Sequence, residues 1–137
     1  MSTSKGAKRE KQLCEILDAA GYETYSPQNI AYGDNDLMGL FDVMARRGHH
    51  LRFIQVKSNR SQGITQWFED TNPYYPMQAV TVGFAVCEDY HGWRYAEATV
   101  DGYEWVYDGR DNGQEMGEGF IKWFRKQVPQ LEASIND

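Results

Sequence analysis

The sequence predicts an α/β fold in one domain, with helices near both ends of the chain and short strands between them. Apolar residues recur at helical spacing over residues 4–20 and 120–127. The segment between them contains short runs rich in β-branched and aromatic residues, separated by glycine, proline and acidic turn residues. A length of 137 residues can bury a sizeable core, so we assign residues 1–137 to a single domain.

The first helix is expected to follow Ser4 and to stop before Gly21, because serine caps helix starts and glycine often follows helix ends. Its buried stripe consists of Leu13, Ile16, Leu17 and Ala20. Glu10 lies about one turn before this stripe, on or beside the apolar face, where an unpaired carboxylate is costly. Glu10 is therefore either a surface charge paired with a neighbour such as Lys11 or a functional carboxylate.

Two runs in the first half predict a β-hairpin. Residues 41–45 and 53–57 are largely apolar, and the basic segment 46–50 between them suits a tight turn. The other elements are expected as strands at 22–25, 80–87, 93–99 and 103–107, a short helix around 64–68, and a last helix at 120–127.

The predicted hairpin carries polar residues that a buried strand would not select for packing. Alternate residues of a strand share a face, so Gln55 and Lys57 should point to one side of the sheet and Ile54 and Val56 to the other. If Asp42 faces the side of Gln55 from the neighbouring strand, a carboxylate, an amide and an ammonium meet there. Such a group can hold a divalent metal ion and a water against a phosphodiester.

Composition restricts the class of protein. The content of 41% hydrophobic and 25% charged residues is typical of a soluble domain. The sequence has no apolar run long enough to span a bilayer and no amino-terminal segment that resembles a secretion signal. We therefore expect a cytoplasmic or equivalent intracellular protein, of cellular or viral origin. Cys14 and Cys87 are expected to be buried thiols in a reducing compartment. We expect His49 and His50 to lie on a solvated turn rather than in a metal site.

Charge is unevenly distributed along the chain. The net charge is -6, yet residues 1–60 contain nine Lys/Arg against seven Asp/Glu, whereas residues 61–137 contain five against thirteen. The positive charge therefore gathers in the half that contains the hairpin. This distribution fits contact with nucleic acid by that half alone, although each of these charges also suits an ordinary solvated surface.

The order of these features resembles the PD-(D/E)-X-K nuclease family, and residues 4–60 are most similar to the archaeal Holliday junction resolvases. Those proteins have a Lys-Gly stretch, as at Lys5-Gly6, and then a helix with a catalytic glutamate, which Glu10 matches. An aspartate strand follows, matched by Asp42, and then a Glu-X-Lys strand, matched by Gln55-Val56-Lys57. The resemblance implies a restriction-endonuclease-like core, with a mixed central β-sheet flanked by α-helices, and a metal-dependent DNA endonuclease.

The resemblance also implies roles for single residues. Asp42 would be the main anionic ligand of Mg²⁺ or Mn²⁺, helped by the Gln55 side-chain carbonyl, the Val56 backbone carbonyl and Glu10, directly or through water. Lys57 would orient or deprotonate the attacking water, or stabilise charge on the phosphate. Phosphate contacts are expected from Lys5, Lys8, Arg9, Arg46, Arg47, Ser58 and Arg60. The partner would be branched or duplex DNA, and the protein a homodimer, because resolvases cut two strands symmetrically.

The sequence departs from the family at two positions. Phe41 replaces the usual proline, and Gln55 replaces a glutamate, which removes one negative charge from the site. Asp34 or Asp36 could compensate, although both also suit turns. Two other hypotheses therefore stay open: a DNA-binding protein that kept the fold without efficient catalysis, and an RNA-processing nuclease. The aromatic residues of the second half could stack on unpaired bases or pair across strands, the more common use.

Overall fold

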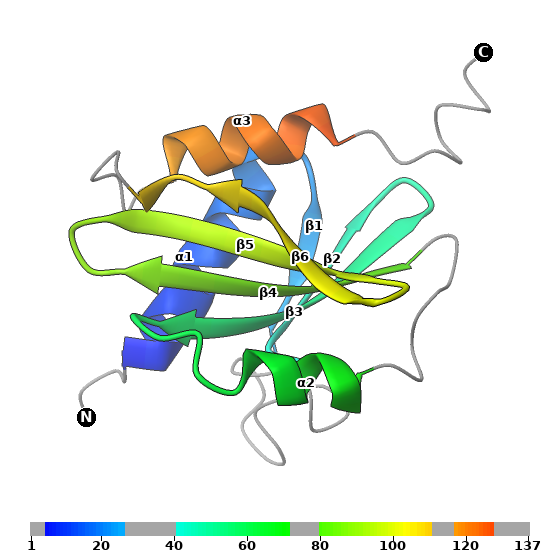
Figure 1. Cartoon of the computed structure of the whole chain (residues 1–137). Helices are drawn as coiled ribbons and strands as arrows, with labels where there is room; N and C mark the ends of the chain where they lie inside the picture. The colour runs from blue at the N-terminus through cyan, green and yellow to red at the C-terminus, as the bar shows by residue number, and fades with distance from the viewer. Residues whose placement is uncertain (1–4, 27–40, 72–79, 111–116, 128–137) are drawn as a thin grey trace, which may run out of the picture.

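A mixed six-stranded sheet forms the centre of the part of the chain that the computed structural model describes, residues 5–26, 41–71, 80–110 and 117–127. The strands are β1 (Glu23–Tyr25), β2 (Val43–Arg47), β3 (His50–Ser58), β4 (Val80–Glu88), β5 (Gly92–Thr99) and β6 (Gly102–Asp108). The helices are α1 (Lys5–Ala19), α2 (Ile64–Asp70) and α3 (Glu118–Lys126) (Figure 1). None of these helices is both long and apolar enough to cross a membrane.

The strands lie side by side in chain order, β1 to β6. Only β3 and β4 run parallel among the paired strands, and the chain connects them through α2. The other four pairs are antiparallel. The carboxyl ends of β3 and β4 therefore meet at one end of the sheet, which is also where β5 begins. The predicted α/β arrangement, with helices flanking a mixed sheet, is confirmed.

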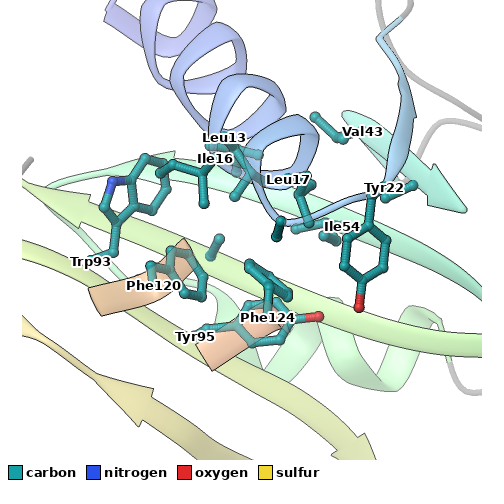
Figure 2. Close-up of a cluster of buried hydrophobic side chains, with 14 of the residues drawn as sticks. Leu13, Ile16, Leu17, Tyr22, Val43, Ile54, Trp93, Tyr95, Phe120 and Phe124 are labelled. Atoms are coloured by element: carbon teal, nitrogen blue, oxygen red, sulfur yellow. The ribbon is translucent and has the colours of Figure 1, made fainter. Parts of the chain in front are cut away.

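Helices cover both faces of the sheet. The stripe predicted for α1 is buried, with Leu13 and Leu17 at 0% exposure, and it packs with Phe120 and Phe124 of α3 against one face. Figure 2 shows these side chains meeting over the same strands. On the other face, α2 contributes a second cluster that includes Trp67. Figure 1 shows α1 passing behind the strands, with α2 below the sheet in that view.

The β2–β3 turn is tighter than the sequence pattern predicts. Both strands extend into the basic segment, leaving Gly48 and His49 as a two-residue turn with Gly48 at φ 60. His49 is exposed, as expected. The expectation for His50 is wrong, because this residue belongs to β3, is partly buried, and its Nε2 lies 2.6 Å from Thr81 Oγ1.

Most aromatic rings of the described residues pack inside the molecule. Phe68 stacks on Tyr103 with centroids 4.7 Å apart, and Tyr107 stacks on Phe120 at 4.8 Å. Both stacks join a helix to the sheet, so they show neither the expected pairing across strands nor stacking on bases. Tyr90, with 85% exposure, is a clear exception.

A buried arginine ties the central strands together. Arg52 is 5% exposed and lies within 5.4–5.9 Å of the ring centroids of Tyr22, Trp123 and Phe124. Its Nη1 donates to Glu97 Oε2 at 2.5 Å, so β3 and β5 are linked across β4. A buried guanidinium needs this carboxylate, because an unpaired charge in such surroundings is costly.

Replacing Glu97 by alanine should therefore lower the free energy of unfolding by about 2 kcal/mol, less than for a fully buried pair because the Glu97 side chain is 23% exposed. The urea unfolding midpoint measures this loss. Glu104→Ala, which removes an exposed glutamate directly opposite Glu97 on β6, is the matched control and should change little. Equal stabilities of the two variants would contradict the role of Glu97.

The stability of the protein should also depend on His50. Burial, with a further effect of Arg52, lowers the pKa of His50 from 6.5 to about 4. Between these values the unfolded chain binds a proton that the folded protein does not, so stability falls as the pH decreases from 6.5 toward 4. His50→Gln should flatten this fall in thermal melts from pH 6.5 to 4.5. His91→Gln, at an exposed histidine, is the control and should leave the fall in stability unchanged. If His50→Gln loses stability with pH as steeply as the wild type, His50 does not cause the fall.

Candidate active site

The pairing of β2 with β3 is irregular at Asp42. Val43 lies opposite Ile54 in the register, and the Asp42 N–H also donates to the Ile54 carbonyl at 2.9 Å. Two residues of one strand thus oppose one residue of the other, which is the arrangement of a β-bulge. The bulge explains why Phe41 packs with α2 whereas Val43 packs with α1, although residues two apart normally share a face.

The bulge directs the Asp42 carboxylate along the sheet rather than onto a face. Its Oδ2 accepts a hydrogen bond from the Val56 N–H at 3.0 Å. The N–H and C=O of one strand residue point to the same edge, so the Val56 carbonyl also points to the side of Asp42. A carboxylate and a backbone carbonyl therefore lie close together at the start of β2, beside the later part of β3.

The remaining residues of the predicted motif follow the expected alternation. Ile54 and Val56 are buried on the α1 side, with exposures of 0% and 4%. Gln55 is partly buried and Lys57 exposed, and both belong to the opposite face. The prediction that Gln55 and Lys57 share a face is confirmed.

Glu10 approaches the same end of the sheet from the other face. It lies on α1, is 8% exposed, and precedes Cys14 by one turn. Cys14 lies beside Thr24 of β1, and burial raises the pKa of its thiol to about 11. Because β1 pairs with β2, this side of α1 faces the strands that lead to Asp42. The structure therefore places Glu10 near the end of the sheet where Asp42 lies, but on the side opposite Gln55 and Lys57.

Two buried serine hydroxyls lie at this end and were not predicted as a pair. Ser26 directly follows β1, and Ser58 is the last residue of β3. The Oγ atoms of both are buried and have no hydrogen-bond partner among the described residues. Buried hydroxyls normally have partners, so the end of the sheet suits a bound water or a hydrated cation. Within the described ranges, however, no three His, Cys, Asp or Glu side chains form a group that could hold a metal ion.

Arg9 does not lie where a phosphate contact requires it. Its side chain is 1% exposed and is paired with Asp89, in the turn between β4 and β5, and with Gln12 at 2.8 Å. Asp89 in turn bonds to Asn59, just after β3, through the Asn59 Nδ2 at 3.2 Å and through its own N–H at 2.7 Å. The expected phosphate contact of Arg9 is therefore wrong: this residue anchors α1 to the ends of β3 and β4.

Arg46 and Arg47 also lie away from the candidate site. They belong to the opposite end of the hairpin, about 20 Å along β3 from Lys57 at ~3.3 Å per residue. Arg46 pairs with Glu23 at 2.7 Å, and Arg47 donates to the Arg125 carbonyl at 3.2 Å. The structure does not bring either residue together with Asp42, contrary to the expected role.

The other predicted phosphate contacts divide into three cases. Lys8 and Arg60 are exposed, as a phosphate contact requires. Ser58 is at the site, but its hydroxyl is buried. The Lys5 side chain, Asp34 and Asp36 lie outside the described residues.

Sequence reasoning missed Ser26, Asn59 and Asp89. Asn59 had a local signal, because asparagine tolerates the left-handed conformation that it adopts here, φ 66. The link from Asp89 to Arg9 had none, since it joins residues 80 positions apart.

A groove on the molecule lies away from these residues. It runs between α2 and the β5–β6 turn, at the opposite end of the sheet from Lys57. Glu69 and Asp101 contribute to its lining, and among the described residues that line it there is no Lys, Arg or His. The groove therefore lacks the positive charge that binding of a phosphate group requires.

Comparisons with known proteins give a similarity of fold. No family model matches the chain, and no curated protein matches it. Among solved structures, the chain is similar to Hjc, a Holliday junction resolvase from the archaeal hyperthermophile Archaeoglobus fulgidus. The TM-score is 0.47 at 17% sequence identity, over 72% of this chain and 85% of that one. At these values the assignment of a function rests on the geometry of the chain's own residues.

Proposed function

We propose that the protein is a metal-dependent DNA endonuclease with a restriction-endonuclease-like core, acting on branched DNA or on duplex DNA with little sequence reading. One observation carries the proposal. The Asp42 carboxylate is held at a β-bulge by the Val56 N–H, and Gln55 and Lys57 are the residues on either side of Val56 in β3. β-bulges often occur beside active sites, where they redirect a side chain.

The oxygen atoms at the bulge are of the kind that Mg²⁺ prefers. Asp42 would provide the anionic ligand, with the Val56 carbonyl and the Gln55 side-chain oxygen beside it, and Glu10 would contribute from the α1 side through water. When bound, Mg²⁺ or Mn²⁺ would supply charge neutralisation and an activated water. The buried Ser26 and Ser58 hydroxyls could bond to waters of such an ion.

The chain's own residues would position the DNA. The exposed Lys57 ammonium can donate to an oxygen of the phosphate to be cleaved, and Lys8 and Arg60 can hold neighbouring phosphates. The site of one chain would cut one strand. Symmetric cleavage of a branched substrate would therefore use a homodimer with two such sites.

A second candidate function is DNA binding without cleavage. The observation that favours it is the amide of Gln55 in place of a carboxylate, combined with the lack of a three-acid metal group in the described part of the chain. Incubation with a four-way junction, linear duplex, single-stranded DNA and RNA, each with Mg²⁺, Mn²⁺ or EDTA, separates the two functions. Metal-dependent cutting of DNA supports the endonuclease, metal-dependent cutting of RNA alone supports an RNA-processing nuclease, and tight binding without cutting supports the alternative.

Asp42→Asn and Lys57→Ala should each reduce cleavage at least about a hundredfold, ~2.7 kcal/mol of barrier. DNA binding measured in EDTA should be largely retained, because phosphate contacts elsewhere give most of the affinity. Lys122→Ala, which removes an exposed lysine of α3, is the matched control and should cut normally. Wild-type cleavage by Asp42→Asn would exclude this residue as the metal ligand.

Gln55→Glu should lower the Mg²⁺ concentration that gives half-maximal cleavage, because it adds an anionic oxygen beside Asp42. The rate at saturating metal need not rise, since tighter ground-state binding does not itself speed the chemical step. A metal titration and a thermal melt in EDTA should be run together. An unchanged Mg²⁺ requirement with a lower Tm would show that Gln55 makes a structural hydrogen bond instead.

A further inference from the structure

The turn between β4 and β5 holds a tyrosine in a conformation that tyrosine rarely adopts. The His91 N–H donates to the Glu88 carbonyl at 3.0 Å, which closes a four-residue turn with Tyr90 in third place. Tyr90 has φ 65, a value for which glycine or asparagine is normally selected at this position. Its side chain is 85% exposed. Tyr90 therefore exposes an aromatic ring to solvent from a backbone conformation that is strained for tyrosine.

Hydrogen bonds and an ion pair hold this turn in place. Asp89, the residue before Tyr90, bonds to Asn59 twice and is paired with the buried Arg9. Such a network can maintain a strained backbone, because strain persists where the surrounding structure leaves no alternative. The position of the Tyr90 backbone is therefore fixed relative to α1 and to the end of β3.

Tyr90 lies at the same end of the sheet as the candidate active site. Ser58 pairs with Cys87 across the parallel strands β3 and β4, and Asn59, which contacts the turn, follows Lys57 by two residues. With strands ~4.8 Å apart and a rise of ~3.3 Å per residue, Tyr90 is about 10–15 Å from Lys57. This distance corresponds to a few nucleotides of a DNA strand.

The acidic residues of the turn are already neutralised. Arg9 pairs with Asp89, and Glu88 lies 3.4 Å from Arg94 Nε and 3.3 Å from Arg110 Nη1. The turn therefore does not present a net negative charge to a DNA strand, and the exposed Arg60 adds a positive charge beside Asn59.

We propose that Tyr90 stacks on an unpaired base of the DNA, close to the phosphodiester positioned at Lys57. This inference rests on the proposed function for the location of the cleaved bond, and it narrows the substrate to DNA with unpaired nucleotides at a fork or branch point. Every base has a face on which a ring can stack, so Tyr90 would recognise the lack of pairing rather than a sequence.

Three variants test this role. Tyr90→Asn removes the ring and suits the left-handed turn, Tyr90→Phe keeps the ring, and Val100→Asn removes an 84% exposed apolar side chain at the opposite end of the sheet. Binding is measured in EDTA by fluorescence anisotropy, with a forked duplex that has unpaired arms and a blunt duplex of the same length. Thermal melts accompany each variant.

Tyr90→Asn should bind the forked duplex about tenfold more weakly, with unchanged affinity for blunt duplex and no loss of Tm. Tyr90→Phe and Val100→Asn should bind like the wild type. Equal affinity of Tyr90→Asn and wild type for the fork, or equal losses on fork and blunt duplex, would overturn the proposal.

Cleavage assays with Mg²⁺ keep this outcome separate from that of the proposed function. If the wild type cuts DNA and Tyr90→Asn binds the fork as tightly as the wild type, the protein is an endonuclease in which Tyr90 does not stack on a base. If the wild type does not cut DNA but Tyr90→Asn binds the fork more weakly, Tyr90 stacks on a base in a protein that is not a nuclease.

Discussion

The β-bulge at Asp42 is the constraint on which the candidate site depends. In a regular hairpin, the side chain of Asp42 would point to one face of the sheet, and the carbonyl of Val56 would pair with β2. Because Asp42 and Val43 both oppose Ile54, the two strands separate early, and the carboxylate reaches the Val56 N–H instead. Polar groups that sheet pairing would have used are thereby gathered at one edge, between two apolar clusters that keep the strands in place.

A network of hydrogen bonds positions α1 relative to the edge of the sheet at Asp42. Arg9 on α1, Asp89 after β4 and Asn59 after β3 form one chain of charge-assisted and amide hydrogen bonds. The buried guanidinium serves packing and orientation rather than DNA contact. Since Glu10 follows Arg9 directly, the same link determines how this carboxylate approaches the sheet. It also holds the backbone beside Tyr90, so the helix, the end of the sheet and the β4–β5 turn are linked directly.

The sequence predicted those features that follow from local periodicity. The α1 stripe, the opposite faces of Gln55 and Val56, and the positions of the strands all reflect spacing that neighbouring residues determine. Asp42 was predicted to lie within the first strand of the hairpin, whereas it directly precedes β2. Its orientation could not be predicted because a bulge breaks the period of two. The phosphate contacts predicted for Arg9, Arg46 and Arg47 are not supported. Arg9 is buried, and Arg46 and Arg47 lie at the far end of the hairpin, and a count of charges along the chain contains neither property.

We propose that the bulge places oxygen ligands for a divalent metal ion. A crystal structure of the protein soaked in Mn²⁺, with anomalous scattering recorded, tests it most directly. We expect an anomalous peak about 2.1 Å from an Asp42 carboxylate oxygen, with the Val56 carbonyl or a water held by Glu10 in the same coordination shell. A Mn²⁺ peak elsewhere on the molecule, with none beside Asp42 at millimolar metal, would contradict it.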